Sequence, residues 1–132
     1  MAIAIIGKEH YKTEVTTSGH SVFVDEPVDV GGTATAPAPS EFLEVALASC
    51  TAITIRMYAD RKGWPVEKIT VDVAINKDEK LTRFERKILL QGELSEEQRQ
   101  RLLQIANSCP VHKVLTNPIE VNTSLINLNL EK

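Results

Sequence analysis

The chain has 132 residues, a net charge of −3, and 15 Lys and Arg against 18 Asp and Glu. A chain of this length is expected to form one domain, residues 1–132, and its interspersed charges exclude the polybasic surface with which proteins bind nucleic acid. The apolar start Met1–Ile6 has no basic segment before it and is too short for a signal peptide, which predicts a soluble, cytoplasmic protein.

Two short strands are predicted first. They cover residues 8–17 and 20–26, and Ser18-Gly19 is the expected turn of this hairpin. Residues 27–39 are rich in Gly, Pro and small side chains, which predicts a loop that leads into the next element. Loops of this length are often functional.

The central element is a long helix predicted from Pro39 to Gly63. Pro39 suits its first turn, Ser40 is expected to cap the free amides, and Arg61 and Gly63 fit a C-terminal stop. At 1.5 Å of rise per residue such a helix is roughly 34 Å long. It is therefore the longest element that the sequence predicts.

The apolar side chains of this helix do not form a single stripe. From Phe42 to Ile55 they point around the whole cylinder, which predicts burial on most sides and a partner subunit that covers what one chain cannot. The polar ends and the hydroxyl side chains in the middle argue against a membrane span. Cys50 lies in the centre of this apolar segment.

A second hairpin is predicted after the helix. Apolar and polar residues alternate from Ile69 to Ile75, residues 76–80 form a polar turn, and a second strand contains Phe84 to Leu94. Arg86 falls on the inward face of that strand. Two interpretations are open for it: a sheet-edge residue whose head group reaches water, or a cation that reaches a functional site.

The last helices place the second cysteine. Ser95-Glu-Glu-Gln98 is a capping box that begins an amphipathic helix ending near Asn107. Pro110 interrupts this helix, so Cys109 is expected at the start of a short helical piece, residues 111–115. Free amides at a helix start favour the thiolate form of a cysteine.

A closing strand with a bulge is predicted for residues 119–130. The complete order is strand, strand, long helix, strand, strand, helix, strand, which predicts an α+β domain with mostly antiparallel sheets. The sequence contains no Gly-rich phosphate loop, no Cys-x-x-Cys pair and no His-Glu-x-x-His zinc motif. Any chemistry must therefore come from Cys50, Cys109 and their surroundings.

Several interpretations are open for these two thiols. Cysteine is among the residues most often buried, so both could be inert core. Cys109-x-x-His112 together with Cys50 would give three metal ligands, but no further ligand pair stands near them, and we expect neither a metal nor a cofactor. The remaining interpretation is a reactive pair, with His112 close to the thiols.

Two motifs resemble the OsmC/Ohr family of thiol peroxidases. They are the segment from Gly32 to Cys50, GTATAPAPSEFLEVALASC, and the segment from Cys109 to Leu115, CPVHKVL, about sixty residues later. The order of the predicted elements also matches, so the resemblance covers essentially the whole chain. It implies an OsmC-like fold, with a mostly antiparallel sheet wrapped around a long central helix, and an intertwined homodimer with active sites at the subunit interface.

The resemblance also implies a reaction. Cys50 would be the peroxidatic residue, whose thiolate attacks the distal oxygen of an organic hydroperoxide and becomes a sulfenic acid as an alcohol leaves. Cys109 would resolve this acid as a disulfide, which a dithiol reductant then reduces. The implied role is defence against oxidative stress, and we expect the two sulfurs to lie close enough to bond.

Two departures from the family pattern concern the ionisation of Cys50. In the hydroperoxide reductases an N-terminal arginine, held by a glutamate at the start of the central helix, stabilises the thiolate. Here no arginine precedes Arg56, and only Lys8 and Lys12 could replace it. The glutamate is Glu41, one position later than expected, and one position rotates a helical side chain by about 100°.

Glu41 is nevertheless the candidate partner of an active-site cation. The departures favour an alternative function, a redox-responsive or small-molecule-binding dimer with little turnover. A structural or metal-binding protein with inert thiols is the third class of function that we consider.

Overall fold

The computed structural model describes residues 1–78 and 80–126. Its two sheets are antiparallel and a long helix lies beside them, so the predicted α+β class is confirmed. The elements in chain order are β1 (Ala2–Ile5), β2 (Thr13–Thr17), β3 (His20–Val24), the 3-10 helix η1 (Val28–Val30), α1 (Pro39–Lys62), β4 (Val66–Lys77), β5 (Thr82–Gly92), α2 (Glu96–Ala106) and α3 (Pro110–Leu115).

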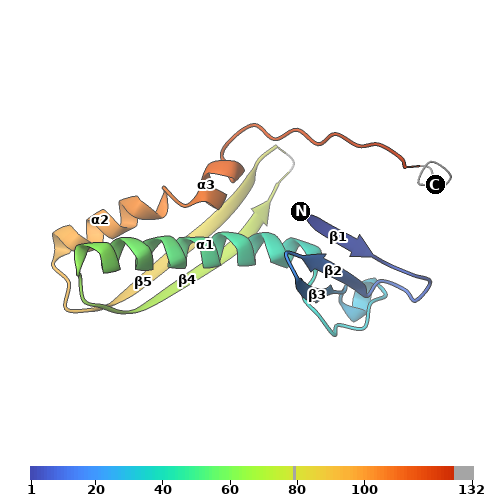
Figure 1. Cartoon of the computed structure of the whole chain (residues 1–132), viewed down its shortest axis with the longest axis horizontal. Coiled ribbons are helices and arrows are strands. Elements are labelled where there is room, and N and C mark those ends of the chain that lie inside the picture. Colours follow the sequence, from blue (N-terminus) through green and yellow to red (C-terminus); the bar gives the residue numbers. More distant parts are fainter. Residues whose placement is uncertain (79, 127–132) are drawn as a thin grey trace.

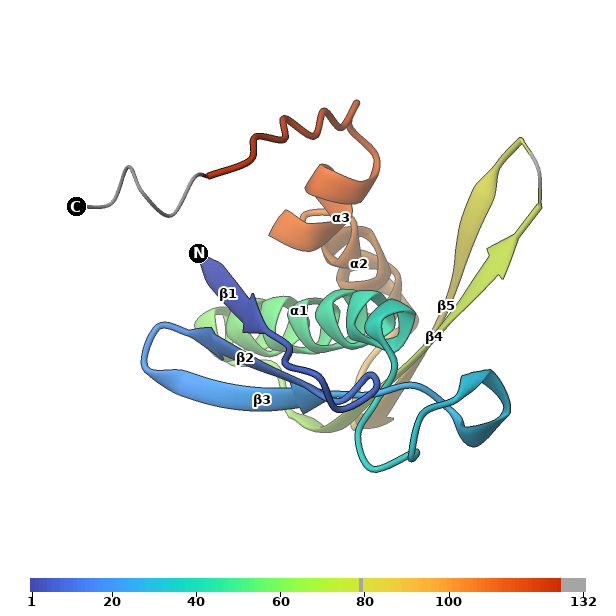
Figure 2. The same ribbon diagram turned by 90° about the vertical axis from the view of Figure 1, so that its right-hand side faces the viewer.

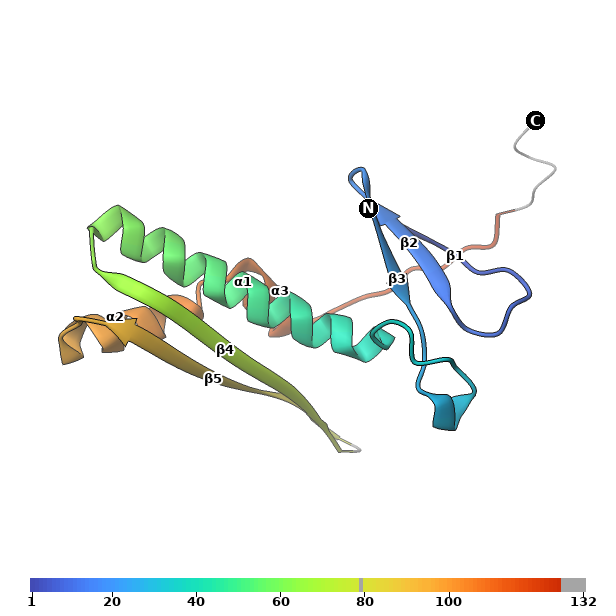
Figure 3. The ribbon, with the colours of Figure 1, turned by 90° about the horizontal axis from the view of Figure 1, so that it is seen from below.

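The helix α1 is the axis of the molecule. The hairpin β4–β5 runs along it, and α2 and α3 pack beside it (Figures 1 and 3). The sheet of β1, β2 and β3 stands apart, next to the start of α1 (Figures 1 and 3), and it lies in front of α1 in Figure 2. After α3 the chain runs away from this body toward the side of the N-terminal sheet (Figure 1).

One face of α1 forms the core. Its buried residues are Leu47, Thr51, Ile55 and Ala59. A spacing of four residues places them in one row along the helix. Ile55 and Ala59 pack against Leu102 and Ala106 of α2 and against Val66 at the start of β4. The core therefore lies between α1, α2 and the hairpin.

The other faces of α1 are open within the single chain, as expected for a helix that one chain cannot cover, and their burial by a partner subunit stays a prediction. Leu43, Val45, Ile53 and Met57 each expose about half of their side chains or more. The reason is that one chain supplies only one covering layer.

By length and composition α1 would pass as a membrane span, with a mean hydropathy of 1.3, but core helices of water-soluble proteins have the same property.

The ends of α1 follow from local sequence. Glu41 Oε1 accepts a hydrogen bond of 2.9 Å from the backbone N–H of Ala38, which is the N-cap, and Pro39 occupies the first position. The prediction of Ser40 as the cap is wrong, because Ser40 lies inside the first turn. Gly63, with a φ of 70°, ends the helix as predicted.

The N-terminal hairpin is present and has a third strand that was not predicted. β2 and β3 pair across the turn at Ser18 and Gly19. The expected first strand is shorter, because the chain reverses between Gly7 and Lys12 and His10 adopts a φ of 40°. β1 thereby pairs with β2, although all of its residues are exposed.

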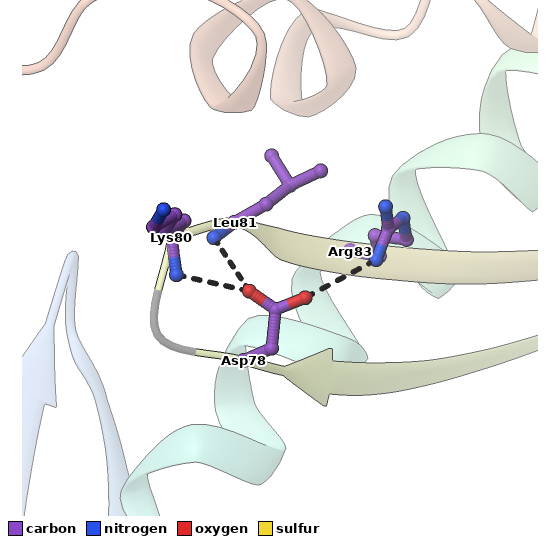
Figure 4. A network of polar contacts seen from close by, with 4 residues as sticks. All are labelled: Asp78, Lys80, Leu81 and Arg83. Atoms are coloured by element: carbon purple, nitrogen blue, oxygen red, sulfur yellow. Dashed lines mark hydrogen bonds and ion pairs between the residues drawn. The ribbon is translucent and has the colours of Figure 1, made fainter.

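The second hairpin matches its prediction. β4 and β5 pair from Val66 opposite Gly92 to Lys77 opposite Thr82. At the tip the carboxylate of Asp78 accepts hydrogen bonds of 2.9 Å from the backbone N–H groups of Lys80 and Leu81 (Figure 4). These bonds lower the pKa of Asp78 and keep its charge at the turn.

The predicted closing strand is wrong for residues 119–126, which follow α3 as irregular chain. Residues 127–130 of this prediction lie outside the described residues. Alternation of apolar side chains produces a strand only where a sheet edge receives it. Within the part of the chain that is described, this segment pairs with no strand.

The loop before α1 is built around the buried carboxylate of Asp25, which is 1 % exposed. Its Oδ2 accepts hydrogen bonds from the backbone N–H and the hydroxyl of both Thr33 and Thr35. The bond from the Thr33 hydroxyl is the main reason why the pKa of Asp25 lies well below its usual value despite burial. A side chain at Gly32 would clash with the Glu26 carbonyl, so only glycine fits there.

We predict that Asp25→Asn lowers the melting temperature at pH 7 by several degrees. The folded pKa of Asp25 is depressed, so its stabilisation is present above about pH 4 and disappears as the pH falls below that value. The difference between the melting temperatures of the two proteins should therefore stay constant from pH 7 to about pH 4 and narrow between pH 4 and pH 2, where the unfolded chain but not the folded protein takes up a proton at this carboxyl group. The exposed Asp29→Asn in the same loop is the control, and parallel curves for Asp25→Asn and wild type would contradict the prediction.

Candidate functional site

The two cysteines meet where α3 packs on α1. Both are free thiols, Cys109 fully buried and Cys50 partly exposed. The pKa of each thiol is shifted by contact with the other. The expectation that residues far apart in sequence bring their sulfurs together is confirmed.

Cys109 is surrounded by hydrogen-bond donors. It is the N-cap of α3, as predicted, and its Sγ accepts a hydrogen bond of 3.4 Å from the backbone N–H of His112. Burial raises the pKa of Cys109, but bonds from the Cys50 thiol, from the backbone of His112 and Val111 and from Thr51 outweigh it. The net pKa of Cys109 therefore lies below its usual value.

The environment of Cys50 acts in the opposite direction. Burial is the largest cause that raises the pKa of Cys50, and its hydrogen bond to Cys109 raises it further. The first proton that the pair loses therefore leaves Cys109, while the S–H of Cys50 donates to the resulting thiolate. Bonds from the backbone of Val111 and from Thr54 lower the pKa of Cys50, but they do not outweigh burial and the contact with Cys109.

Arg86 reaches this site from β5. Its Nη1 donates to Thr51 Oγ1 at 3.1 Å and its Nη2 donates to Nδ1 of His112 at 3.2 Å. Because a guanidinium has no acceptor, Nδ1 must accept, so the ring proton is on Nε2. Burial and the charge of Arg86 lower the pKa of His112, which is neutral at pH 7. Of the two interpretations of Arg86, the structure supports the cation at a functional site.

Two cavities border α1, one at Cys50 and one at the Arg86 and His112 side chains. The first, of about 840 Å³, is largely apolar and includes Cys50, Ile53, Met57 and Val111 in its wall. The second, of about 770 Å³, is more polar and is bordered by Arg86 and His112, among others. An apolar molecule in the first cavity would thus reach Cys50, whereas Cys109 is not exposed.

Glu41 is not brought to the thiols within this chain. It caps α1 nine residues before Cys50, about 13 Å away along the helix axis. Lys12, a possible substitute for the absent arginine, stacks over Phe23 with 5.1 Å between its Nζ and the ring centre. The pairing of Glu41 with an active-site cation stays a prediction.

The alternative of a three-ligand metal site is not supported by this arrangement. His112 uses Nδ1 as an acceptor for Arg86. Across residues 1–78 and 80–126, no three His, Cys, Asp or Glu side chains are placed to hold a metal ion.

Sequence reasoning missed two residues of the site, Thr51 and Asn107. Thr51 is a polar residue in the buried row of α1, and Asn107 is the C-cap of α2 that binds Arg86 with 2.8 Å between Oδ1 and Nη2. A threonine within an apolar helical face was the available signal for the first. No sequence signal pointed to Asn107, because a polar residue is common at the end of a helix.

Comparison with known proteins gives one family. The profile of the family described as OsmC-like protein matches residues 32–124. No curated protein sequence matches the chain.

The fold is shared with several solved structures. An OsmC-like protein from Mycoplasma pneumoniae has a TM-score of 0.76 at 18 % identity, covering 96 % of each chain. Two organic hydroperoxide resistance proteins are similar as well. The protein from Legionella pneumophila has a TM-score of 0.63 at 20 % identity, covering 87 % of each chain. The protein from Elizabethkingia anophelis has a TM-score of 0.67 at 17 % identity, covering 90 % of this chain and 89 % of its own. The OsmC-like fold is thereby confirmed.

We predict that Cys109 ionises before Cys50. In Cys50→Ser the new hydroxyl still donates to Cys109, whose thiolate should form below the usual cysteine pKa. In Cys109→Ser the remaining Cys50 lies in an apolar wall, and burial should hold its pKa above the usual value. Thiolate absorbance at 240 nm as a function of pH measures both, with the double serine variant as the blank. The reverse order of titration would contradict the assignment.

Proposed function

Because the chain belongs to the OsmC-like protein family, we propose that it is a thiol-dependent peroxidase that reduces organic hydroperoxides. The observation that carries this proposal is the contact between free Cys50, in the wall of an apolar cavity, and free Cys109, which is supplied with hydrogen bonds. The names of two structural neighbours, organic hydroperoxide resistance proteins, agree with it.

Cys50 is the peroxidatic residue in this proposal, because it is the thiol that faces the cavity. Its proton passes to the neighbouring Cys109 thiolate, and the Cys50 thiolate attacks the terminal oxygen of the hydroperoxide. The O–O bond breaks, two electrons pass from sulfur to the peroxide, and the alkoxide takes the proton from Cys109 and leaves as an alcohol. Cys50 becomes a sulfenic acid.

Cys109 is the resolving residue. Having returned its proton, it is again a thiolate and attacks the sulfur of the Cys50 sulfenic acid. The S–S bond forms, and the hydroxide that leaves is protonated by solvent to water. A dithiol reductant then reduces the disulfide by exchange, which restores both thiols. Such a cycle requires a reducing compartment, so we place the protein in the cytoplasm, in defence against oxidative stress.

A homodimer is the second part of the proposal. α1 leaves Val45, Ile53 and Met57 uncovered, and every residue of β1 is exposed. Soluble proteins rarely leave an apolar surface of this kind in water. A second copy that covers these surfaces would intertwine with the first and would close the cavity at Cys50, at the subunit interface.

One observation favours the alternative of a redox-responsive or small-molecule-binding dimer with little turnover. The raised pKa of Cys50 keeps the cavity-facing thiol protonated at neutral pH, which slows its attack on a peroxide. The two functions differ in rate, since both allow a disulfide to form. Sustained turnover with a dithiol separates them.

We predict that one equivalent of cumene hydroperoxide removes two hydrogens per chain in an intact-mass measurement, as the disulfide forms. Cys50→Ser should react at the uncatalysed rate, and Cys109→Ser should stop at a sulfenic acid that dimedone traps. The exposed Ser21→Ala in β3 is the control. Unchanged mass in the wild type would exclude the peroxidase and the redox-responsive dimer together.

We predict that Ile53→Asp weakens dimerisation by about 100-fold or more, because it would bury an unpaired carboxylate between two α1 helices. Light scattering after gel filtration over a range of concentrations measures the change. Val28→Asp likewise replaces an exposed β-branched side chain by a carboxylate, in η1, and should leave the mass unchanged. A monomeric wild type would contradict the dimer.

A further inference from the structure

We propose that Arg86 is a positioning residue for the thiol pair and takes the place of the absent N-terminal arginine. It acts from β5, and through Thr51 and His112 instead of by direct contact with sulfur. This inference rests on the proposed function for its biological meaning, but its geometry and its test concern the thiols alone.

The guanidinium of Arg86 joins all three helices around the thiols. Nη1 donates to Thr51 Oγ1 on α1 at 3.1 Å and to the carbonyl of Ala106 at the end of α2 at 3.4 Å. Nη2 donates to Oδ1 of Asn107 at 2.8 Å and to Nδ1 of His112 on α3 at 3.2 Å. One rigid, planar group thus sets the relative position of the helices that carry Cys50 and Cys109.

Thr51 links Arg86 to the sulfurs. It follows Cys50 in the chain and is fully buried. Its oxygen accepts from Arg86, and its single hydroxyl proton has two neighbouring acceptors, the carbonyl of Leu47 at 2.7 Å and the Cys109 sulfur. Arg86 fixes this oxygen from the other side and, as a cation, makes the hydroxyl a better donor to a thiolate.

His112 is the second link. Its backbone N–H bonds to Cys109 Sγ at 3.4 Å, while its ring is held by Arg86. Loss of Arg86 would free the ring and with it the first turn of α3, which supplies that N–H. Arg86 therefore controls two of the donors that make Cys109 acidic.

Arg86 is bonded to no carboxylate among the residues that the structure describes, and Arg61 of α1 is a second cation near the site, in the wall of the first cavity with Cys50. From α1 and α3 the titratable groups are Cys50, Cys109 and the neutral His112, and α2 contributes only an uncharged carbonyl and an amide. Lys77 and Glu85 border the same cavity with opposite charges. If Arg86 served only to join β5 to α2, its bonds to Ala106 and Asn107 would be enough. The bonds to Thr51 and His112 connect it in addition to the residues that contact Cys109.

The test is the thiolate absorbance at 240 nm against pH, measured on the reduced protein without peroxide. We expect Arg86→Gln to contain about three- to tenfold less thiolate at pH 7, since removal of a nearby cation raises a thiol pKa. Thr51→Val, which keeps the shape but removes the hydroxyl, should change in the same direction, and Thr51→Ser should retain the wild-type titration. Asn107→Ala removes one bond of Arg86 that does not lead to a thiol and is the matched control.

The outcomes separate positioning from a merely structural role. A lower melting temperature with an unchanged thiol titration in Arg86→Gln, or a change as large in Asn107→Ala, would overturn the proposal. If Arg86→Gln does not fold, Thr51→Val decides, and a wild-type titration in that variant would overturn it as well. Since no substrate is used, a shifted titration in a protein without peroxidase turnover would refute the proposed function and leave this inference standing.

Discussion

The contact between the Cys50 and Cys109 thiols is the constraint on which the rest of the site depends. Two sulfurs that share a proton require a dry junction with enough donors to hold one negative charge. The packing of α3 on α1 provides the junction, and Thr51 and the backbone of His112 provide donors. The same contact divides the roles, since the thiol that faces the cavity is not the one that ionises first.

The surroundings of this pair explain why a polar network lies within an apolar fold. Arg86 occupies an inward position of β5 between Phe84 and Ile88, where a guanidinium is costly unless its hydrogens are bonded. Four acceptors bond its two Nη atoms. A network so complete fixes the helices in one arrangement and leaves the open faces of α1 as the surface on which a second subunit would complete the fold.

Prediction from sequence succeeded where the determinant was local. Pro39 and Gly63 mark the ends of α1, and Pro110 places Cys109 at a helix start, because backbone restrictions act within a few residues. Prediction failed where strand formation depends on pairing with a segment that is distant in the sequence. The first strand pairs only because the chain turns back after Gly7, and the alternation after Ile119 meets no sheet edge in the described chain.

The helices, the second hairpin and the two cysteine motifs could thus be predicted from the amino-acid sequence, since each depends on neighbours in the chain. Which of the two thiols has the lower pKa could not be predicted, because it depends on contacts between distant elements. The pKa of Cys109 is lowered by Cys50, by Thr51 and by the backbone of His112, and we propose that Arg86 positions the last two; these residues come from α1, β5 and α3 and meet only when the core packs. A pKa depends on distance in space through desolvation and hydrogen bonding, and spacing along a sequence contains neither.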